Sequence, residues 1–148
     1  MTPDVRARLH ESWELASPHA DALATCFYAR LFEIDVAAGR LFADTDMEAQ
    51  RGKFVTMLDR IVRAVDEPRT LVPDVTALAR RHVAYGVEDR HYASVGEALL
   101  FALGETLGDL FTSDVHAAWV EAYALLAALM QRGAARPASS PSLSEQMR

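Results

Sequence analysis

Hydrophobic residues recur along most of the chain at spacings of three and four, which is the pattern of helices with one buried face. No segment alternates apolar and polar residues between hairpin turns, so the sequence predicts no strand. The pattern predicts helices over about residues 3–16, 18–34, 47–65, 75–87, 90–110 and 113–133, with a short helical turn within 35–42. The predicted fold class is therefore all-α.

Several of the predicted boundaries carry residues that commonly start or stop a helix. Thr2-Pro3 places a hydroxyl cap and a proline at the start of the first helix, and Ser17-Pro18 repeats this arrangement at the second. Thr45 or Asp46 can cap the helix over 47–65, and Gly133 is the expected stop of the last helix. Because the helices differ in length and meet at corners with prolines, the sequence favours orthogonally packed helices over a four-helix bundle.

Length and charge limit the classes of protein to which this chain can belong. A chain of 148 residues is long enough for one domain with a substantial core. We expect that domain over 1–133, followed by a mobile tail rich in proline and serine over 134–148. The net charge of −6 argues against a nucleic-acid partner. No apolar run approaches the roughly 20 residues of a membrane span, and the first residues show no signal peptide, so a cytoplasmic location is the default expectation.

The helix predicted over 75–87 carries a histidine on its inward face. The inward residues follow one another at spacings of four, three, four and three, and they are Leu71, Val75, Leu78, His82 and Tyr85. The pattern alone leaves two interpretations of His82 open. It could be a core histidine whose ring nitrogens are hydrogen-bonded to backbone or buried water. It could also be a ligand to iron, copper or zinc, which neutral imidazole binds readily.

Two more polar side chains are predicted to lie near the inside of the protein. Tyr28 follows the buried Phe27 on the second helix, so it should point beside the core and not into solvent. Gln50 belongs to the inward stripe of the helix over 47–65, although a glutamine near a helix start is more often partly exposed. The one cysteine, Cys26, lies among apolar neighbours, where core packing is the simplest role.

The inward polar residues and six short motifs together resemble the heme-binding globins, in particular the single-domain bacterial globins and the globin half of flavohemoglobins. The resemblance extends over about residues 5–132. Its motifs occur in the family's order: F-Y-A-R-L-F at 27–32, L-F at 41–42, D-M-E-A-Q-R-G-K-F at 46–54, R-R-H-V-A-Y-G-V at 80–87, H-Y-A-S-V-G-E-A-L-L at 91–100 and A-A-W-V-E-A-Y at 117–123. The resemblance implies a globin fold, with helices packed around a heme pocket and heme b (iron protoporphyrin IX) as the cofactor.

The resemblance implies that His82 is the proximal ligand to the heme iron. One ring nitrogen would bind the iron, and the other N–H could bond a carbonyl about one turn earlier, near Leu78, which would fix the tautomer. Val87 and Tyr92 are implied to line the same side of the pocket. In flavohemoglobins a tyrosine, here Tyr92, acts with a glutamate to polarise the histidine, but residues 132–134 offer no carboxylate.

Tyr28 and Gln50 then become the distal pair, whose O–H and N–H groups stabilise the partial negative charge of bound dioxygen in a dry pocket. Bound carbon monoxide is less polar, so hydrogen bonds from Tyr28 and Gln50 should stabilise it less than they stabilise dioxygen. Phe42 would pack against the porphyrin, and Lys53 could either meet a heme propionate or remain solvated. Phe54 would narrow the approach to the iron, at a position where flavohemoglobins usually have an aliphatic residue.

Two functions follow from the resemblance, and a third class is weighed against them. The first function is reversible binding of dioxygen for storage, delivery or scavenging. The second is that of a nitric oxide dioxygenase, which forms nitrate and would here require a separate reductase. A heme-based sensor normally carries an output domain, and a heme-free relative would have little reason to place His82 opposite Tyr28 and Gln50. The remaining histidines are predicted to lie on the surface: His10, His19, His91 and His116.

Overall fold

Helices are the only regular elements in the part of the chain that the structure describes. The computed structural model describes residues 1–67, 69, 76–77, 79–81 and 89–135. In chain order the elements are α1 (Pro3–Ala16), η1 (Ser17–His19), α2 (Ala20–Ile34), α3 (Val36–Arg40), α4 (Met47–Ala64), α6 (Asp89–Leu107), η3 (Gly108–Leu110) and α7 (Ser113–Ala135). Residues 76–77 and 79–81 are also helical. The predicted all-α class is confirmed.

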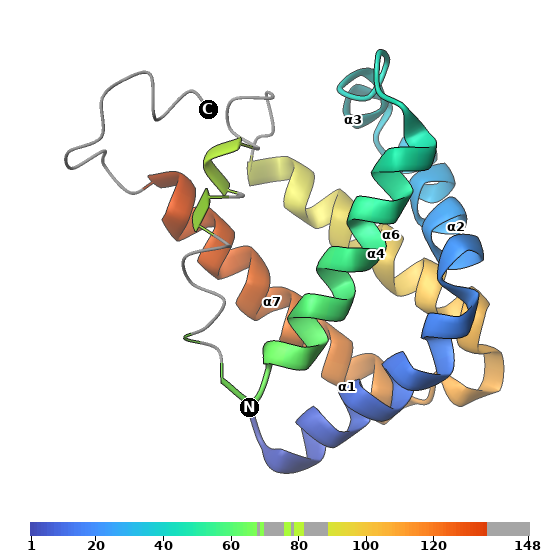
Figure 1. Ribbon diagram of the computed structural model, residues 1–148, viewed down its shortest axis with the longest axis vertical. Helices are drawn as coiled ribbons and strands as arrows, with labels where there is room; N and C mark the ends of the chain where they lie inside the picture. The colour runs from blue at the N-terminus through green and yellow to red at the C-terminus, as the bar shows by residue number, and fades with distance from the viewer. Residues whose placement is uncertain (68, 70–75, 78, 82–88, 136–148) are drawn as a thin grey trace.

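The long helices cross one another instead of running parallel. In Figure 1, α4 runs from upper right to lower left and crosses α6 and α7, which both descend from upper left to lower right, while α1 lies along the lower edge and α2 along the right edge. Among the described elements, α2 packs most extensively against α6, and α1 packs against α7. This arrangement agrees with the orthogonal packing predicted from the unequal helix lengths.

A buried hydrogen-bonded chain joins the first and last helices. The largest fully buried side chains are Leu9, Leu23, Leu103 and Trp119. The indole N–H of Trp119 donates to Ser12 Oγ at 2.9 Å, and the Ser12 hydroxyl donates to the carbonyl of Leu9 at 3.2 Å. Because these groups have lost contact with water, the hydrogen bonds satisfy polar atoms that would otherwise destabilise the core.

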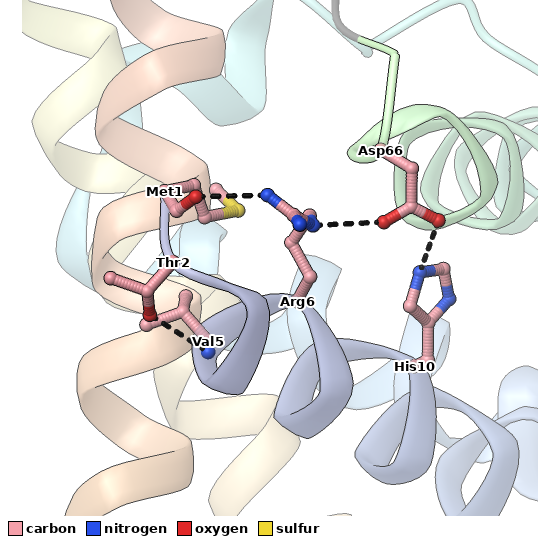
Figure 2. A network of polar contacts seen from close by, with 6 residues as sticks. All are labelled: Met1, Thr2, Val5, Arg6, His10 and Asp66. Carbon is pink, nitrogen blue, oxygen red and sulfur yellow. Dashed lines mark hydrogen bonds and ion pairs between the residues drawn. The ribbon is translucent and has the colours of Figure 1, made fainter.

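The N-terminal end of α1 is held by a cap and by charged contacts with the residues that follow α4 (Figure 2). The Thr2 hydroxyl accepts a hydrogen bond from the Val5 N–H at 3.2 Å, as the cap-then-proline pattern predicted. Asp66 lies 3.0 Å from Arg6 Nε and 3.2 Å from His10 Nε2. These side chains are partly exposed, and ion pairs in contact with water contribute little to the free energy of unfolding. Their main effect is to orient α1 relative to the end of α4.

Three helix boundaries differ from the sequence prediction. Ser17-Pro18 does not open an α-helix, because residues 17–19 form the 3₁₀ turn η1 without a side-chain cap and α2 begins at Ala20. The last α-helical residue of α6 is Leu107, short of the predicted end at residue 110, so Leu110 falls in η3 and is exposed. Gly133 does not stop α7, which continues to Ala135. A glycine lowers helix propensity but ends a helix only where the backbone turns left-handed.

The described part of the chain contains no helix that is both long enough and apolar enough to cross a membrane.

Replacement of Ser12 by alanine should test the buried chain between α1 and α7. The variant leaves the indole N–H of Trp119 without its acceptor, so the free energy of unfolding should fall by about 1–3 kcal/mol in urea titrations. Ser17→Ala is the matched control, because the Ser17 side chain caps no helix, and it should change stability by less than about 0.5 kcal/mol. Equal stability of the Ser12→Ala and wild-type proteins would contradict the assignment.

Candidate functional site

Two polar side chains that lie 22 positions apart in the sequence meet inside the protein. Tyr28 projects from the middle of α2 and is only 6% exposed, while Gln50 lies in the first turn of α4 and is partly buried. The Gln50 amide Nε2–H donates a hydrogen bond to Tyr28 Oη at 3.1 Å. The structure thus brings together the two residues that the sequence placed on the inward sides of separate helices.

Four phenylalanine rings surround the ring of Tyr28. The distances from the Tyr28 ring centre are 4.8 Å to Phe27, 5.5 Å to Phe42, 5.7 Å to Phe54 and 5.9 Å to Phe32. Phe27 and Phe32 come from α2, Phe42 from the turn after α3, and Phe54 from α4. The Phe27, Phe42 and Phe54 contacts are edge-to-face, a favourable geometry for aromatic pairs. The site is therefore an apolar enclosure with a phenol and an amide as its polar groups.

The Tyr28 hydroxyl remains a hydrogen-bond donor at neutral pH. Burial raises the pKa of the Tyr28 phenol above its ordinary value, and the hydrogen bond from Gln50 offsets only part of that effect. In the contact with Gln50 the hydroxyl oxygen is the acceptor, and no described residue accepts the phenolic proton. That proton is thus available to a ligand with partial negative charge.

Acidic caps fix the two backbone corners that carry Phe42 and Gln50. Asp46 accepts hydrogen bonds from the N–H groups of Glu48 and Ala49 at 3.1 and 3.4 Å, which fixes the start of α4 at Met47, three residues before Gln50. Asp35 caps α3 through the N–H of Ala38 at 3.0 Å. Its second carboxylate oxygen accepts a hydrogen bond from the Ser94 hydroxyl at 3.0 Å, which links this corner to α6.

Hydrogen bonding to the backbone N–H of Ala38, aided by the Ser94 hydroxyl, lowers the pKa of Asp35 below its ordinary value. The carboxylate is therefore ionised at neutral pH, the form that accepts both hydrogen bonds.

A second tyrosine contact lies at the junction of α6 and α7. The Tyr123 hydroxyl donates a hydrogen bond to the backbone carbonyl of Tyr92. Burial, followed by the nearby Tyr92, raises the pKa of the Tyr123 phenol well above its ordinary value, so it stays a donor. Gly96 makes the approach possible, because a Cβ at this position would lie 2.7 Å from Tyr123 Cε2. The sequence analysis included Tyr123 in a motif at residues 117–123 and assigned it no role of its own.

Tyr92 itself packs in a small apolar cluster apart from the Tyr28 enclosure. Ala79 and Met130 form its buried part, and Ala64, Tyr92, Leu126 and Leu129 pack against them. Ala79 therefore packs among residues from three helices. These come from the N-terminal part of α6 and from the C-terminal parts of α4 and α7. His82 and Val87, the other two residues predicted on this side, lie outside the described residues.

The other predicted positions divide into partly buried and exposed residues. Phe42 and Phe54 are partly buried and pack against the main core, whereas Lys53 is exposed. The prediction that His91 lies on the surface is wrong, since this side chain is only 4% exposed at the start of α6. The preceding residue, Arg90, is exposed, so a buried histidine lies directly beside a charged surface residue in the sequence. Within the described residues, no three His, Cys, Asp or Glu side chains are grouped so that they could hold a metal ion.

Comparison with known proteins shows the family of this chain. The globin family matches residues 25–130, and the chain belongs to that family. A flavohemoprotein of Bordetella parapertussis is 31% identical over 132 residues, which cover 88% of this chain and 33% of that protein. Neuroglobin of Danio rerio is 28% identical over 141 residues, covering 86% of this chain and 89% of that protein. The chain spans about a third of the length of the flavohemoproteins it matches.

Solved structures confirm the globin fold. An engineered carbene transferase derived from a candidate nitric oxide dioxygenase of Rhodothermus marinus has a TM-score of 0.83 at 29% identity, with coverage of 91% of this chain and 94% of that one. A hexacoordinated heme protein from an anhydrobiotic tardigrade has a TM-score of 0.85 at 18% identity, covering 92% and 96%. The tardigrade structure, at 18% identity, shows the shared fold alone. Membership of the globin family supports heme binding by this chain.

Proposed function

We propose that this globin binds dioxygen reversibly and with high affinity, with Tyr28 and Gln50 as the donors on the distal side of the heme. The observation that carries this proposal is the hydrogen-bonded Tyr28–Gln50 pair in an apolar enclosure. Heme b would supply the iron to which the diatomic ligand binds. The chain's own residues would then determine how strongly that ligand is held.

The chemistry of the distal pair favours a polar diatomic ligand. The phenolic proton of Tyr28 is not used within the described residues, and Gln50 Nε2 carries a second N–H beyond the one it donates to Tyr28. Hydrogen bonds to a partly negative ligand are stronger in an apolar site than in water. Dioxygen should gain more from them than carbon monoxide, which is less polar when bound. Slow release of dioxygen follows.

The proximal assignment rests on the sequence. His82 would bind the iron through one ring nitrogen, while Val87 and Tyr92 would line that side of the pocket. Phe42, whose ring contacts Tyr28, would also pack against the porphyrin. Lys53 is exposed one turn from Gln50 on α4, so its ammonium could reach a propionate at the pocket mouth. A cytoplasmic location remains a prediction.

The replacement Tyr28→Phe should increase the dioxygen dissociation rate by about an order of magnitude or more, because one charge-stabilising donor is lost while the ring is kept. Stopped-flow displacement of dioxygen measures this rate. Carbon monoxide dissociation in the same variant is the internal control and should change far less. An unaltered dioxygen rate would mean that Tyr28 is not a distal donor.

The replacement His82→Ala should abolish stable heme retention, because the imidazole that would bind the iron is lost. Heme content is read from the Soret absorbance per protein after gel filtration. His19→Ala, at an exposed position, is the matched control and should retain heme fully. Full heme occupancy with an unchanged spectrum in His82→Ala would refute the ligand role.

A nitric oxide dioxygenase is the second candidate, favoured by the similarity to flavohemoproteins and to the Rhodothermus marinus structure. The dioxygenase would join nitric oxide and dioxygen into nitrate and would need an electron from a separate reductase after oxidation of the iron. Residues 132–134 supply no carboxylate to act with Tyr92, which weakens this candidate.

Nitrate formation from nitric oxide, measured with and without an added reductase, should distinguish the two functions. A carrier should form nitrate once per heme and stop in both cases, since its iron is not reduced again. Sustained turnover with the reductase at a rate that consumes nitric oxide catalytically would instead establish the enzyme.

A further inference from the structure

Phe54 contacts both Tyr28 and the residue that precedes it on α2. The Phe54 ring stacks on Phe27 with ring centres 4.1 Å apart and an angle of 14° between the planes. It meets Tyr28 edge-on, at 5.7 Å and 65°. Phe27 and Tyr28 are themselves in edge-to-face contact at 4.8 Å and 79°. The three rings therefore form a closed set in which each touches the other two.

This set limits how the Tyr28 ring can turn. Phe27 is 3% exposed and Tyr28 is 6% exposed, so neither ring can move outward into water without losing buried apolar contact. Phe42 and Phe32 contact other parts of the Tyr28 ring at 5.5 and 5.9 Å. In a closely packed interior a side chain moves only if its neighbours move with it. Rotation about the Cα–Cβ bond (χ1) would displace the hydroxyl most, because it lies at the far end of the ring, whereas a flip of the ring about its own axis leaves the oxygen in place.

We propose that Phe54 is a positioning residue for the distal donor: stacked on Phe27 and edge-on to Tyr28, its ring holds the Tyr28 hydroxyl in the direction in which it donates to a diatomic ligand. The inference rests on the proposed function of Tyr28. It differs from the role expected from the sequence, in which Phe54 only narrows the approach to the iron. If the ring acts through Tyr28, its removal should change the dissociation rate of a polar ligand more than that of a less polar one. If the ring only blocks space, the change in rate should depend on the size of the ligand.

The test combines Phe54→Leu with Tyr28→Phe in a double-mutant cycle on the heme-loaded protein. Phe54→Leu keeps an apolar side chain but removes the stacked ring, so the dioxygen dissociation rate should increase roughly 3- to 10-fold as the donor loses its fixed direction. Carbon monoxide dissociation should stay within about 2-fold. In the Tyr28→Phe background the same replacement should have no further effect on the dioxygen rate, because the hydroxyl it positions is gone.

Two controls separate positioning from general damage to the fold. Phe101→Leu is the matched replacement at an exposed ring on α6 that lies against Arg30, and it should leave all ligand rates unchanged. The χ1 rotamer of Tyr28, measured by NMR in the diamagnetic carbon monoxide complex, should be single in the wild type and averaged over more than one rotamer in Phe54→Leu. If Phe54→Leu does not fold, Phe54→Met takes its place, since methionine fills irregular space without a fixed ring.

The proposal is overturned if the dioxygen rate of Phe54→Leu is unchanged, if the carbon monoxide rate rises equally, or if the effect is as large in the Tyr28→Phe background. A single, unchanged χ1 rotamer of Tyr28 in Phe54→Leu would overturn it as well. Should Tyr28→Phe alone leave dioxygen release unaltered, the distal assignment of Tyr28 fails, and the positioning role fails with it. The Tyr28→Phe single variant therefore tells the two failures apart.

Discussion

A phenol buried among four aromatic rings, with an amide as its hydrogen-bond partner, is the interaction on which the site depends. Transfer of a hydroxyl from water to an apolar site costs free energy unless a partner replaces the water. Gln50 replaces it at the oxygen of Tyr28, but the phenolic proton keeps its capacity to donate. The enclosure formed by the described residues therefore suits a small ligand with partial negative charge, which can accept the proton that none of those residues accepts.

The rest of the fold holds the parts of this enclosure in place. The acidic caps Asp35 and Asp46 fix the corners that lead to Phe42 and Gln50. Ser94 links the first of these corners to α6, where α2 makes its most extensive contact. Apart from the enclosure, the Tyr123 hydroxyl bonds the backbone of Tyr92 across the close approach that Gly96 permits, which holds α6 against α7. The two acidic caps lie at helix ends, and the rings around Tyr28 are apolar.

The sequence predicted the helices and the inward polar residues because periodicity reports which face of a helix is buried. It could not show that Tyr28 and Gln50 are in contact, since periodicity says nothing of how two helices meet. Boundary errors at Ser17 and Gly133 arose because cap and stop residues are only preferences, which packing overrides. His91 was misplaced although it lies four residues before Val95 and seven before Ala98 on the buried face of α6, because a histidine next to charged residues was taken to be on the surface. The roles of His82 and Val87, together with the division at residue 133, remain predictions.

The most direct test of the distal pair is the infrared C–O stretching frequency of the carbon monoxide complex. A hydrogen-bond donor aimed at the ligand oxygen weakens the C–O bond, so the wild-type protein should absorb at lower frequency than a variant without the donor. The C–O stretching frequency should rise in Tyr28→Phe and should rise by a smaller amount in Gln50→Leu. An identical frequency in the wild-type protein and both variants would contradict it, because no donor would then face the ligand.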